Sequence, residues 1–258
     1  MKKLIVLALL LSVLTVTGCG SKLKLTAVPG EINELYSAEP TSKPIENIKL
    51  KIKTPLSGQL VKEKSVTVSF EVQNFVLGAK TKGHGKNGLA ASDKGQHIHL
   101  IVDNEPYQAV YDVSQPVIIT DLKPGRHSIR AFLSRSWHES VKEAGSYEET
   151  DFYFQKVTTE TIPTAGVLTY SRPKGDYVGK DAKLILVDFF LDKVELSPEG
   201  FKVKLVVDGK ATYLTTWKTY YLKDLAPGEH KIQLALLDAK NKRVPGAFNN
   251  TYRTIVIK

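Results

Sequence analysis

Apolar and polar residues alternate along most of the chain from Asn47 onward. Short runs such as IKLKIK (48–53), VTVSFEV (66–72) and HIHLIVD (97–103) place apolar side chains at every second position, and Gly, Pro, Asn and Asp separate them. This period of two is typical of strands that bury one face, whereas an amphipathic helix repeats every 3.6 residues. No long stretch has the helical period, so the pattern predicts an all-β protein built as a sandwich or a barrel.

The β-rich part of the chain contains two copies of one unit. The segment GQHIHLIVDN (95–104) aligns with GFKVKLVVDG (200–209), and DLKPGRHSIRAFL (121–133) aligns with DLAPGEHKIQLAL (224–236). A third pair, residues 57–72 and 174–189, aligns more loosely. Because the three segments recur in the same order, we predict two tandem β-sandwich domains, at residues 47–158 and 163–258.

The first copy carries an insertion. The distance between equivalent glycines falls from 117 residues (Gly58 to Gly175) to 105 (Gly95 to Gly200), so the first copy has 12 additional residues between its second and third strands. They fall in a Gly- and Lys-rich loop at about residues 78–95, which also holds His84. Loops of this length are usually functional or disordered. We expect a solvated, flexible loop, and the alternative is a loop that cradles an anion.

The first eighteen residues predict a secretory signal. Lys2 and Lys3 precede an apolar run from Leu4 to Val16, which is shorter than the roughly 20 residues needed to span a bilayer. The run ends in Val16-Thr17-Gly18-Cys19, which resembles the lipobox of bacterial lipoproteins. The resemblance implies that residues 1–18 are removed and that Cys19, the only cysteine, is lipidated and becomes the first residue of the mature chain. Residues 19–46 contain three prolines and little periodicity, so we expect a flexible tether.

The charge pattern limits the partners. The formal net charge is +9, but basic and acidic residues alternate and no run of five basic residues occurs. Such mixed charge is typical of a solvated surface, so we expect no nucleic-acid partner. The expected partners are the membrane, through the N-terminal lipid, and an envelope or extracellular protein or glycan. The residue after the cysteine is Gly20, whereas Asp at this position would favour retention in the inner membrane. Gly20 therefore favours the outer membrane, if the organism has one.

The repeat also resembles exported bacterial proteins built from immunoglobulin-like β-sandwich domains. The turns VDN and VDG and the phrase L-x-PG-x-H before a later strand carry this resemblance over about 210 residues. It implies a fold but no activity, because such sandwiches host many functions.

The pair His97 and His99 is the main candidate for chemistry. The two histidines share one face of their strand, while Ile98 and Leu100 share the other. The second copy has Lys202 and Lys204 at the histidine positions, and two unpaired lysines would not face a core. We therefore expect both histidines to point outward, exposed to solvent, as part of a surface that binds a non-metal ligand.

The alternative is a copper or zinc site. Side chains at positions i and i+2 of a strand start about 6.6 Å apart, so two imidazoles can converge on one ion. His84 on the inserted loop, or His138 in SRSWHES (134–140), would supply a third ligand. Arg130, expected on the same outward face, counts against a cation. The sequence leaves the two interpretations open.

The segment SRSWHES adds Arg135, Trp137 and His138 as candidate ligand-binding residues, because exposed Trp and Arg are common at binding hot spots. Trp137 could instead cap the end of the sandwich. His127 and His230 occupy equivalent places after Pro-Gly, and we expect each to be half-buried and hydrogen-bonded to the preceding turn.

No motif of a hydrolase, metalloprotease or thiol enzyme occurs, so we expect no enzyme. The sequence predicts a lipid-anchored, extracytoplasmic binding or adhesion protein whose first domain carries the function.

Overall fold

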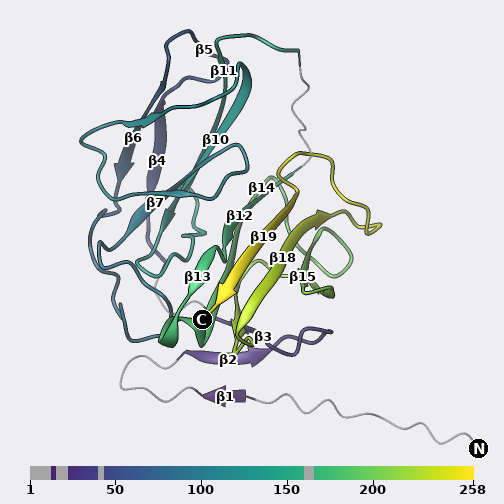
Figure 1. Ribbon diagram of the computed structural model, residues 1–258. Coiled ribbons are helices and arrows are strands. Elements are labelled where there is room, and N and C mark those ends of the chain that lie inside the picture. The colour runs from purple at the N-terminus through teal and green to yellow at the C-terminus, as the bar shows by residue number, and fades with distance from the viewer. Residues whose placement is uncertain (1–12, 16–22, 40–43, 160–165) are drawn as a thin grey trace, which may run out of the picture.

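The computed structural model describes residues 13–15, 23–39, 44–159 and 166–258, and it shows two β-sandwiches in tandem (Figure 1). The predicted all-β fold with two immunoglobulin-like domains is confirmed. Each domain has its own apolar core, one around Ile98 and Ile129 and one around Val203 and Ile232. Of the described helical segments, none has the length and apolar character that a membrane crossing would need.

The first domain packs a five-stranded sheet on a three-stranded sheet. In spatial order the larger sheet contains β5 (Leu60–Val61), β11 (Tyr147–Phe154), β10 (Gly125–Ser134), β7 (His97–Val102) and β8 (Gln108–Val110). The smaller sheet contains β4 (Lys49–Thr54), β6 (Val66–Gln73) and β9 (Val117–Ile119). The alternating apolar residues of both sheets meet in the core, as period-two patterning predicts.

The second domain also packs two sheets. One contains β13 (Gly175–Tyr177), β19 (Asn250–Ile257), β18 (Gly228–Leu237), β15 (Lys202–Val207) and β16 (Lys210–Leu214). The other has six strands in the order β1 (Val13–Thr15), β2 (Lys24–Ala27), β3 (Leu35–Ala38), β17 (Thr219–Lys223), β14 (Leu184–Asp192) and β12 (Val167–Arg172). A short 3₁₀ helix spans Gly179–Ala182 and precedes β14.

The N-terminal segment corrects the expectation of a tether over residues 19–46. Strand β3 pairs antiparallel with β17, and β2 pairs with β3, so this segment completes a sheet of the second domain. Leu25, Ile32 and Leu35 are at most 1% exposed. Burial of these three apolar side chains, which are widely spaced in the sequence, holds the segment against the domain.

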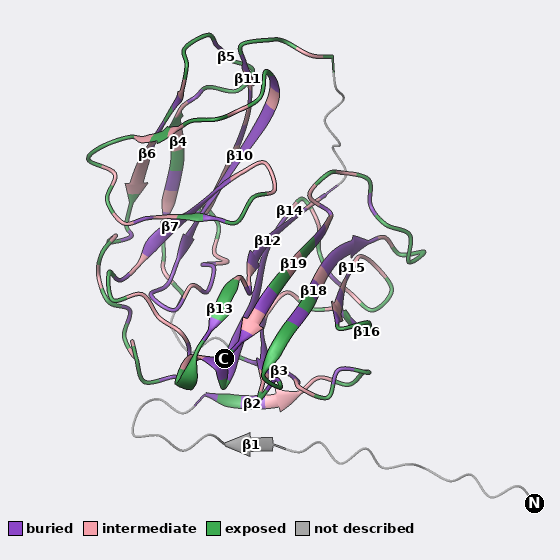
Figure 2. Ribbon diagram, in the orientation of Figure 1, coloured by how far each residue is buried: buried purple, intermediate pink, exposed green. Residues whose placement is uncertain are grey.

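The two domains pack face to face through the sheets that lie between their cores. Strand β14 is buried from Leu184 to Leu191 (Figure 2). Its odd-numbered residues face their own core, and its even-numbered residues face the first domain and the N-terminal segment. Phe190 lies 5.4 Å from Phe132 and 4.6 Å from Tyr147, measured between ring centroids. The outer face of the first domain's larger sheet is therefore an interface and not a solvent-facing surface.

The repeated turn is stabilised in the same way in both domains. His127 Nε2 lies 2.7 Å from the Lys123 carbonyl oxygen and its Nδ1 lies 2.8 Å from Asp103. His230 has the same two contacts, with Ala226 and Asp208. The predicted contact of each histidine with the preceding turn is confirmed, but both residues are buried and not half-buried. The aspartates of VDN and VDG are their additional partners.

Residues 1–12 and 16–22 lie outside the described residues, and so does Cys19. The predicted signal and lipidation site therefore stay predictions.

Candidate metal centre between the two sandwiches

Strand β7 places His97 and His99 on the face of the sheet opposite the core of the first domain. Ile98 and Leu100 point into that core, as the comparison of the two copies predicts. The expectation of solvent exposure is wrong, however, because both histidines are 0% exposed. The second domain covers this face, and Ser171 of β12 contacts His99 Nδ1 at 3.1 Å.

His138 reaches the same place from the turn that follows β10. The turn closes through a 2.9 Å hydrogen bond from the His138 amide to the Arg135 carbonyl, and His138 has a φ of +68°. Asn241, at the equivalent position of the second copy, has a φ of +59°, so the left-handed conformation belongs to the repeated turn. Antiparallel pairing places Ser134, the last residue of β10, opposite His97, so the turn begins beside the histidine pair.

The inserted loop holds this turn in place and is not a flexible solvated loop. Thr81 donates its amide to Ser136 Oγ at 2.8 Å, and the Ser136 amide donates to Thr81 Oγ1 at 3.0 Å. The Ser92 amide donates to the Ser136 carbonyl at 2.7 Å. Leu89 is buried in a cluster that also contains Trp137 and residues of the second domain. The extra residues of the first copy therefore position the turn that carries His138.

Three imidazole nitrogens converge. His97 Nε2 lies 3.0 Å from His99 Nε2 and 3.0 Å from His138 Nδ1, and the three ligand atoms lie within 4.8 Å of one another. Nitrogen ligands at 2.0–2.1 Å from a tetrahedral zinc ion are about 3.3 Å apart. The two separations from His97 Nε2 are close to that value, and the third is at most 4.8 Å, so side-chain shifts would place all three nitrogens on one ion.

Hydrogen bonds at the opposite edges of the rings leave the converging nitrogens free to coordinate. The Gly95 carbonyl oxygen, 2.8 Å from His97 Nδ1, can only accept, so Nδ1 carries the proton and Nε2 presents a lone pair. Ser171 Oγ can accept from His99 Nδ1 in the same way. A backbone carbonyl or hydroxyl that fixes the tautomer of a histidine is a common feature of metal sites.

Aromatic side chains wall the cluster. Tyr107 stacks on His99 with ring centroids 3.5 Å apart, and Tyr111 lies 4.8 Å from His97. The Tyr107 hydroxyl is 3.1 Å from His138 Nδ1. Burial raises the pKa of Tyr107, so its hydroxyl stays protonated and can donate to His138 when no ion occupies that nitrogen. His138 is half-buried and forms the accessible edge of the cluster.

The surroundings keep the imidazoles neutral. Desolvation by burial lowers the pKa of His97 to about 4 and that of His138 to about 2, and it lowers the pKa of His99 well below its ordinary value. Two nearby cations, Arg172 and Lys174, add to the lowering. All three rings are therefore neutral at pH 7, which is the form that binds metals.

Several predicted site residues lie elsewhere. His84 is outside the cluster, with Nε2 3.4 Å from Asp93. Arg135 is buried and lies 3.7 Å from Glu143, and Trp137 is 2% exposed and donates to Glu139 at 2.6 Å. The predicted exposed binding surface of histidine, Arg135 and Trp137 is thus wrong, because the N-terminal segment, the inserted loop and the second domain cover it.

Arg130 is on the predicted face but does not contact the cluster. Its position on β10 is four residues from Ser134, about 13 Å along the strand.

Sequence reasoning missed the residues that surround the histidines, namely Tyr107, Ser171, Arg172 and Lys174. The run LILVDFFL (184–191) contains one signal that could have indicated them. Apolar residues at both odd and even positions indicate a strand buried on both faces. That pattern predicts a partner for the outer face of the second domain, and the first domain is the available partner.

Comparisons with known proteins add resemblance in fold only. No family model matches the chain, and no curated protein matches it. Among solved structures, fibronectin(III)-like modules of Clostridium thermocellum CbhA are 15% identical, with 81% of this chain and 94% of that chain covered and a TM-score of 0.28. The central fibronectin-III array of RIM-binding protein is 11% identical, with coverage of 85% and 70% and a TM-score of 0.25. The D00-D0 domain of intimin is 9% identical, with coverage of 80% and 99% and a TM-score of 0.22. The description of the fold rests on the strand order and the two cores.

Proposed function

We propose that this protein is a non-enzymatic binding protein whose ligand is a copper or zinc ion held by His97, His99 and His138. The convergence of three neutral imidazole nitrogens within 4.8 Å carries the proposal. Imidazole is a suitable ligand for both metals, and three protein ligands leave one position open.

The charges around the site bear on the choice of ion. Arg172 stacks over Tyr107 at 5.4 Å, and Lys174 lies 3.7 Å above the same ring, so two cations lie beside the imidazoles. The acidic side chains of the described residues do not take part in the cluster of possible ligands. Coulomb repulsion scales with the charge of the ion, so Cu⁺ is opposed half as strongly as Zn²⁺ at the same position.

Titration of the full chain, purified in detergent and stripped with a chelator, tests the site. Zn²⁺ and Cu⁺ affinities come from competition with chromophoric chelators, and Co²⁺ reports the geometry through its visible spectrum. We expect dissociation constants below about 1 µM, which corresponds to about 8 kcal/mol of binding free energy. Intense visible bands, typical of four-coordinate Co²⁺, should accompany binding.

His138→Ala is the preferred variant because His138 lies at the edge and contributes little to either core. Loss of one of three ligands should weaken the affinity at least 100-fold and abolish the Co²⁺ bands. His84→Ala, which removes a histidine outside the cluster, is the matched control and should bind as the unmodified protein does. Equal affinities of the His138→Ala variant and the unmodified protein would exclude the site.

We also propose that the protein is exported and anchored in the cell envelope by lipid on Cys19, with the outer membrane as the favoured location in a two-membrane cell. The Val16-Thr17-Gly18-Cys19 motif after an apolar run supports this. Two acyl chains hold a protein on a membrane far more firmly than one. Metabolic labelling with a palmitate analogue should label the protein and not its Cys19→Ser variant, and the variant should leave the membrane fraction. Equal labelling of both would contradict the anchor.

A further inference from the structure

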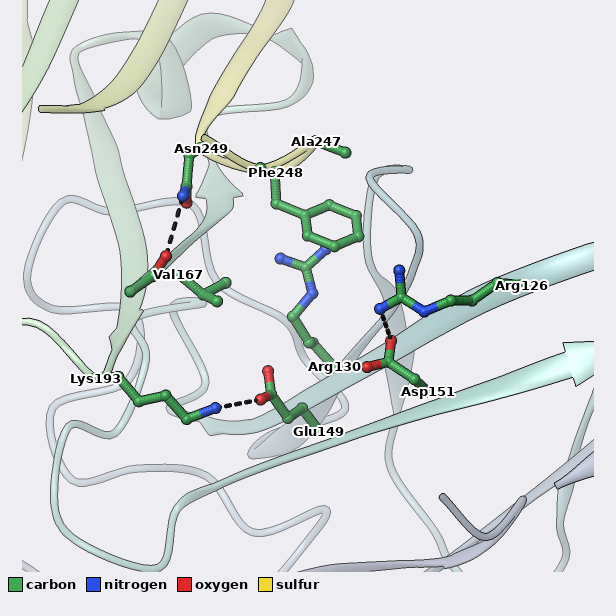
Figure 3. Close-up of a pocket in the computed structure, with 11 residues that line it drawn as sticks. Arg126, Arg130, Glu149, Asp151, Val167, Lys193, Ala247, Phe248 and Asn249 are labelled. Carbon is green, nitrogen blue, oxygen red and sulfur yellow. Dashed lines mark hydrogen bonds and ion pairs between the residues drawn. The ribbon is translucent and has the colours of Figure 1, made fainter. Parts of the chain in front are cut away.

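A cavity lies between the domains, away from the histidines. Strands β10 and β11 of the first domain form one side, and the loop before β19 forms the other, with Phe248 against the Arg130 guanidinium (Figure 3). Its volume is about 220 Å³. A cavity of about 150 Å³ is large enough to hold benzene. The space therefore suits a ligand of the size of a substituted aromatic ring.

The three cations that line this cavity differ in their ion pairs. Arg126 pairs with Asp151 at 2.9 Å, and Lys193 pairs with Glu149 at 2.8 Å. Arg130 is the third cation of the lining, and no carboxylate in the described part of the chain lies within ion-pair distance of it. Lys193 also pairs with Asp192 at 3.1 Å, so Arg130 is the one cation of the lining that lacks a carboxylate partner among the described residues.

Arg130 is a costly residue to bury in this way. It is 1% exposed, and desolvation lowers its pKa to about 10, so it remains charged at neutral pH. Its Nη atoms donate to Thr169 Oγ1 and the Asp103 carbonyl. Its Nε is buried without a hydrogen-bond partner, and the Nε of Arg126 is in the same condition. A buried donor without a partner is destabilising, and an anionic acceptor would satisfy it.

The remaining walls are mostly apolar. The Phe248 ring lies 3.3 Å from the Arg130 guanidinium, and Val167 and Ala247 line the cavity beside Gly166 and Gly246. Asn249 is the polar residue of these walls, and its amide donates to the Gly166 carbonyl at 3.0 Å. The small residues leave the hollow open.

We propose that this cavity binds a small organic carboxylate with an aromatic or other apolar body. The carboxylate lies beside the guanidinium groups of Arg130 and Arg126, and the body lies against Phe248 and Val167. Guanidinium and carboxylate match in geometry as well as in charge. The site does not depend on the metal centre, because no cluster histidine lines it.

Binding of 4-fluorobenzoate to the full chain in detergent, followed by ¹⁹F NMR with a metal chelator present, tests the proposal. The neutral analogue 4-fluorobenzamide has nearly the same shape and controls for apolar burial and for partitioning into micelles. We expect the carboxylate to bind at least tenfold more tightly than the amide. Equal binding of the two, or no binding of either at millimolar concentration, would overturn the proposal.

Two variants locate the site. Arg130→Gln introduces the residue that Gln233 provides at the equivalent position of the second domain, and it should weaken carboxylate binding at least tenfold. Ala247→Trp fills the cavity from its exposed rim while keeping both arginines, so it should abolish binding even if Arg130→Gln fails to fold. Lys240→Gln removes one exposed charge elsewhere and should have no effect. Unchanged binding in the Ala247→Trp variant would place the ligand elsewhere and refute the assignment.

Discussion

Acid should destabilise the metal-free protein through the three clustered imidazoles. An unfolded histidine titrates near pH 6.5, whereas burial lowers the pKa of His97 to about 4 and that of His138 to about 2 in the folded state. At pH values between the folded and unfolded pKa values, the unfolded chain binds protons that the folded chain does not. Stability is therefore complete above about pH 6.5 and falls as the pH decreases toward the folded pKa values.

His97 sets the scale of this effect. An imidazole with an unfolded pKa of 6.5 and a folded pKa of about 4 removes about 3 kcal/mol of unfolding free energy at pH 4 relative to pH 7.5. His99 and His138 act in the same direction, although the three rings interact and their contributions do not add independently. Domains of this kind are stable by only about 5–15 kcal/mol, so a loss of this size is large.

Urea unfolding at several pH values between 4 and 7.5, with a chelator present, measures the slope of stability against pH. Each histidine that is protonated only on unfolding contributes at most about 1.4 kcal/mol per pH unit. The His138→Gln variant should therefore have a shallower slope than the unmodified protein by about that amount between pH 4 and 6. His84→Gln gives the baseline for replacing a histidine outside the cluster. Equal slopes for His138→Gln and the unmodified protein would refute the reasoning.

Three further substitutions test how the site is supported. Trp137→Ala should lower the free energy of unfolding by about 3–5 kcal/mol in a denaturant titration, because the ring is 2% exposed and joins both domains; a loss below about 1 kcal/mol would contradict this packing. Gly95→Ala would place a Cβ 2.3 Å from a backbone carbonyl oxygen, so it should displace the inserted loop and weaken Co²⁺ binding at least tenfold, whereas Gly85→Ala, with no atom within 4 Å, should not. Leu25→Asp places a charge at a fully buried position and should make the segment of β2 and β3 sensitive to limited proteolysis, while Lys24→Asp on the exposed face should not; equal cleavage would argue against burial of the segment.

Much of the fold could be predicted because its signals are local. The alternation in 97–102 assigns Ile98 and Leu100 to a core, and the structure places them there. The repeated Pro-Gly-x-His phrase predicts a histidine bound to its own turn, which is confirmed for His127 and His230. These features depend on residues within a few positions of one another or on one strand pair, so the sequence pattern determines them.

The burial of the histidines could not be predicted in this way. Comparison with Lys202 and Lys204 correctly separates the two faces of β7, but it assumes that equivalent faces have equivalent surroundings. The two lysines are half-buried at a face with no domain beyond it, whereas the outer face of β7 packs against β12 and β14. Docking of one domain on another depends on shape over many residues. The positions of His97 and His99 on their strand therefore do not reveal that the two residues are buried.

The duplication explains why the candidate site occurs in only one copy. Two sandwiches in tandem have four outer sheet faces. Face-to-face packing of the domains buries one of these faces in each domain. On the buried face of the first domain, lysines at positions 97 and 99 would be charged and without partners, which is costly. Histidine avoids that cost because desolvation leaves it neutral, and it keeps a lone pair for a ligand.

A His97→Lys/His99→Lys variant, which restores the residues of the second copy, should therefore separate or unfold the domains. By contrast, Lys202→His/Lys204→His on the uncovered copy should change stability by less than about 1 kcal/mol, as expected for surface substitutions. Equal destabilisation by the two pairs of substitutions would show that packing between the domains does not determine which residue each strand can carry.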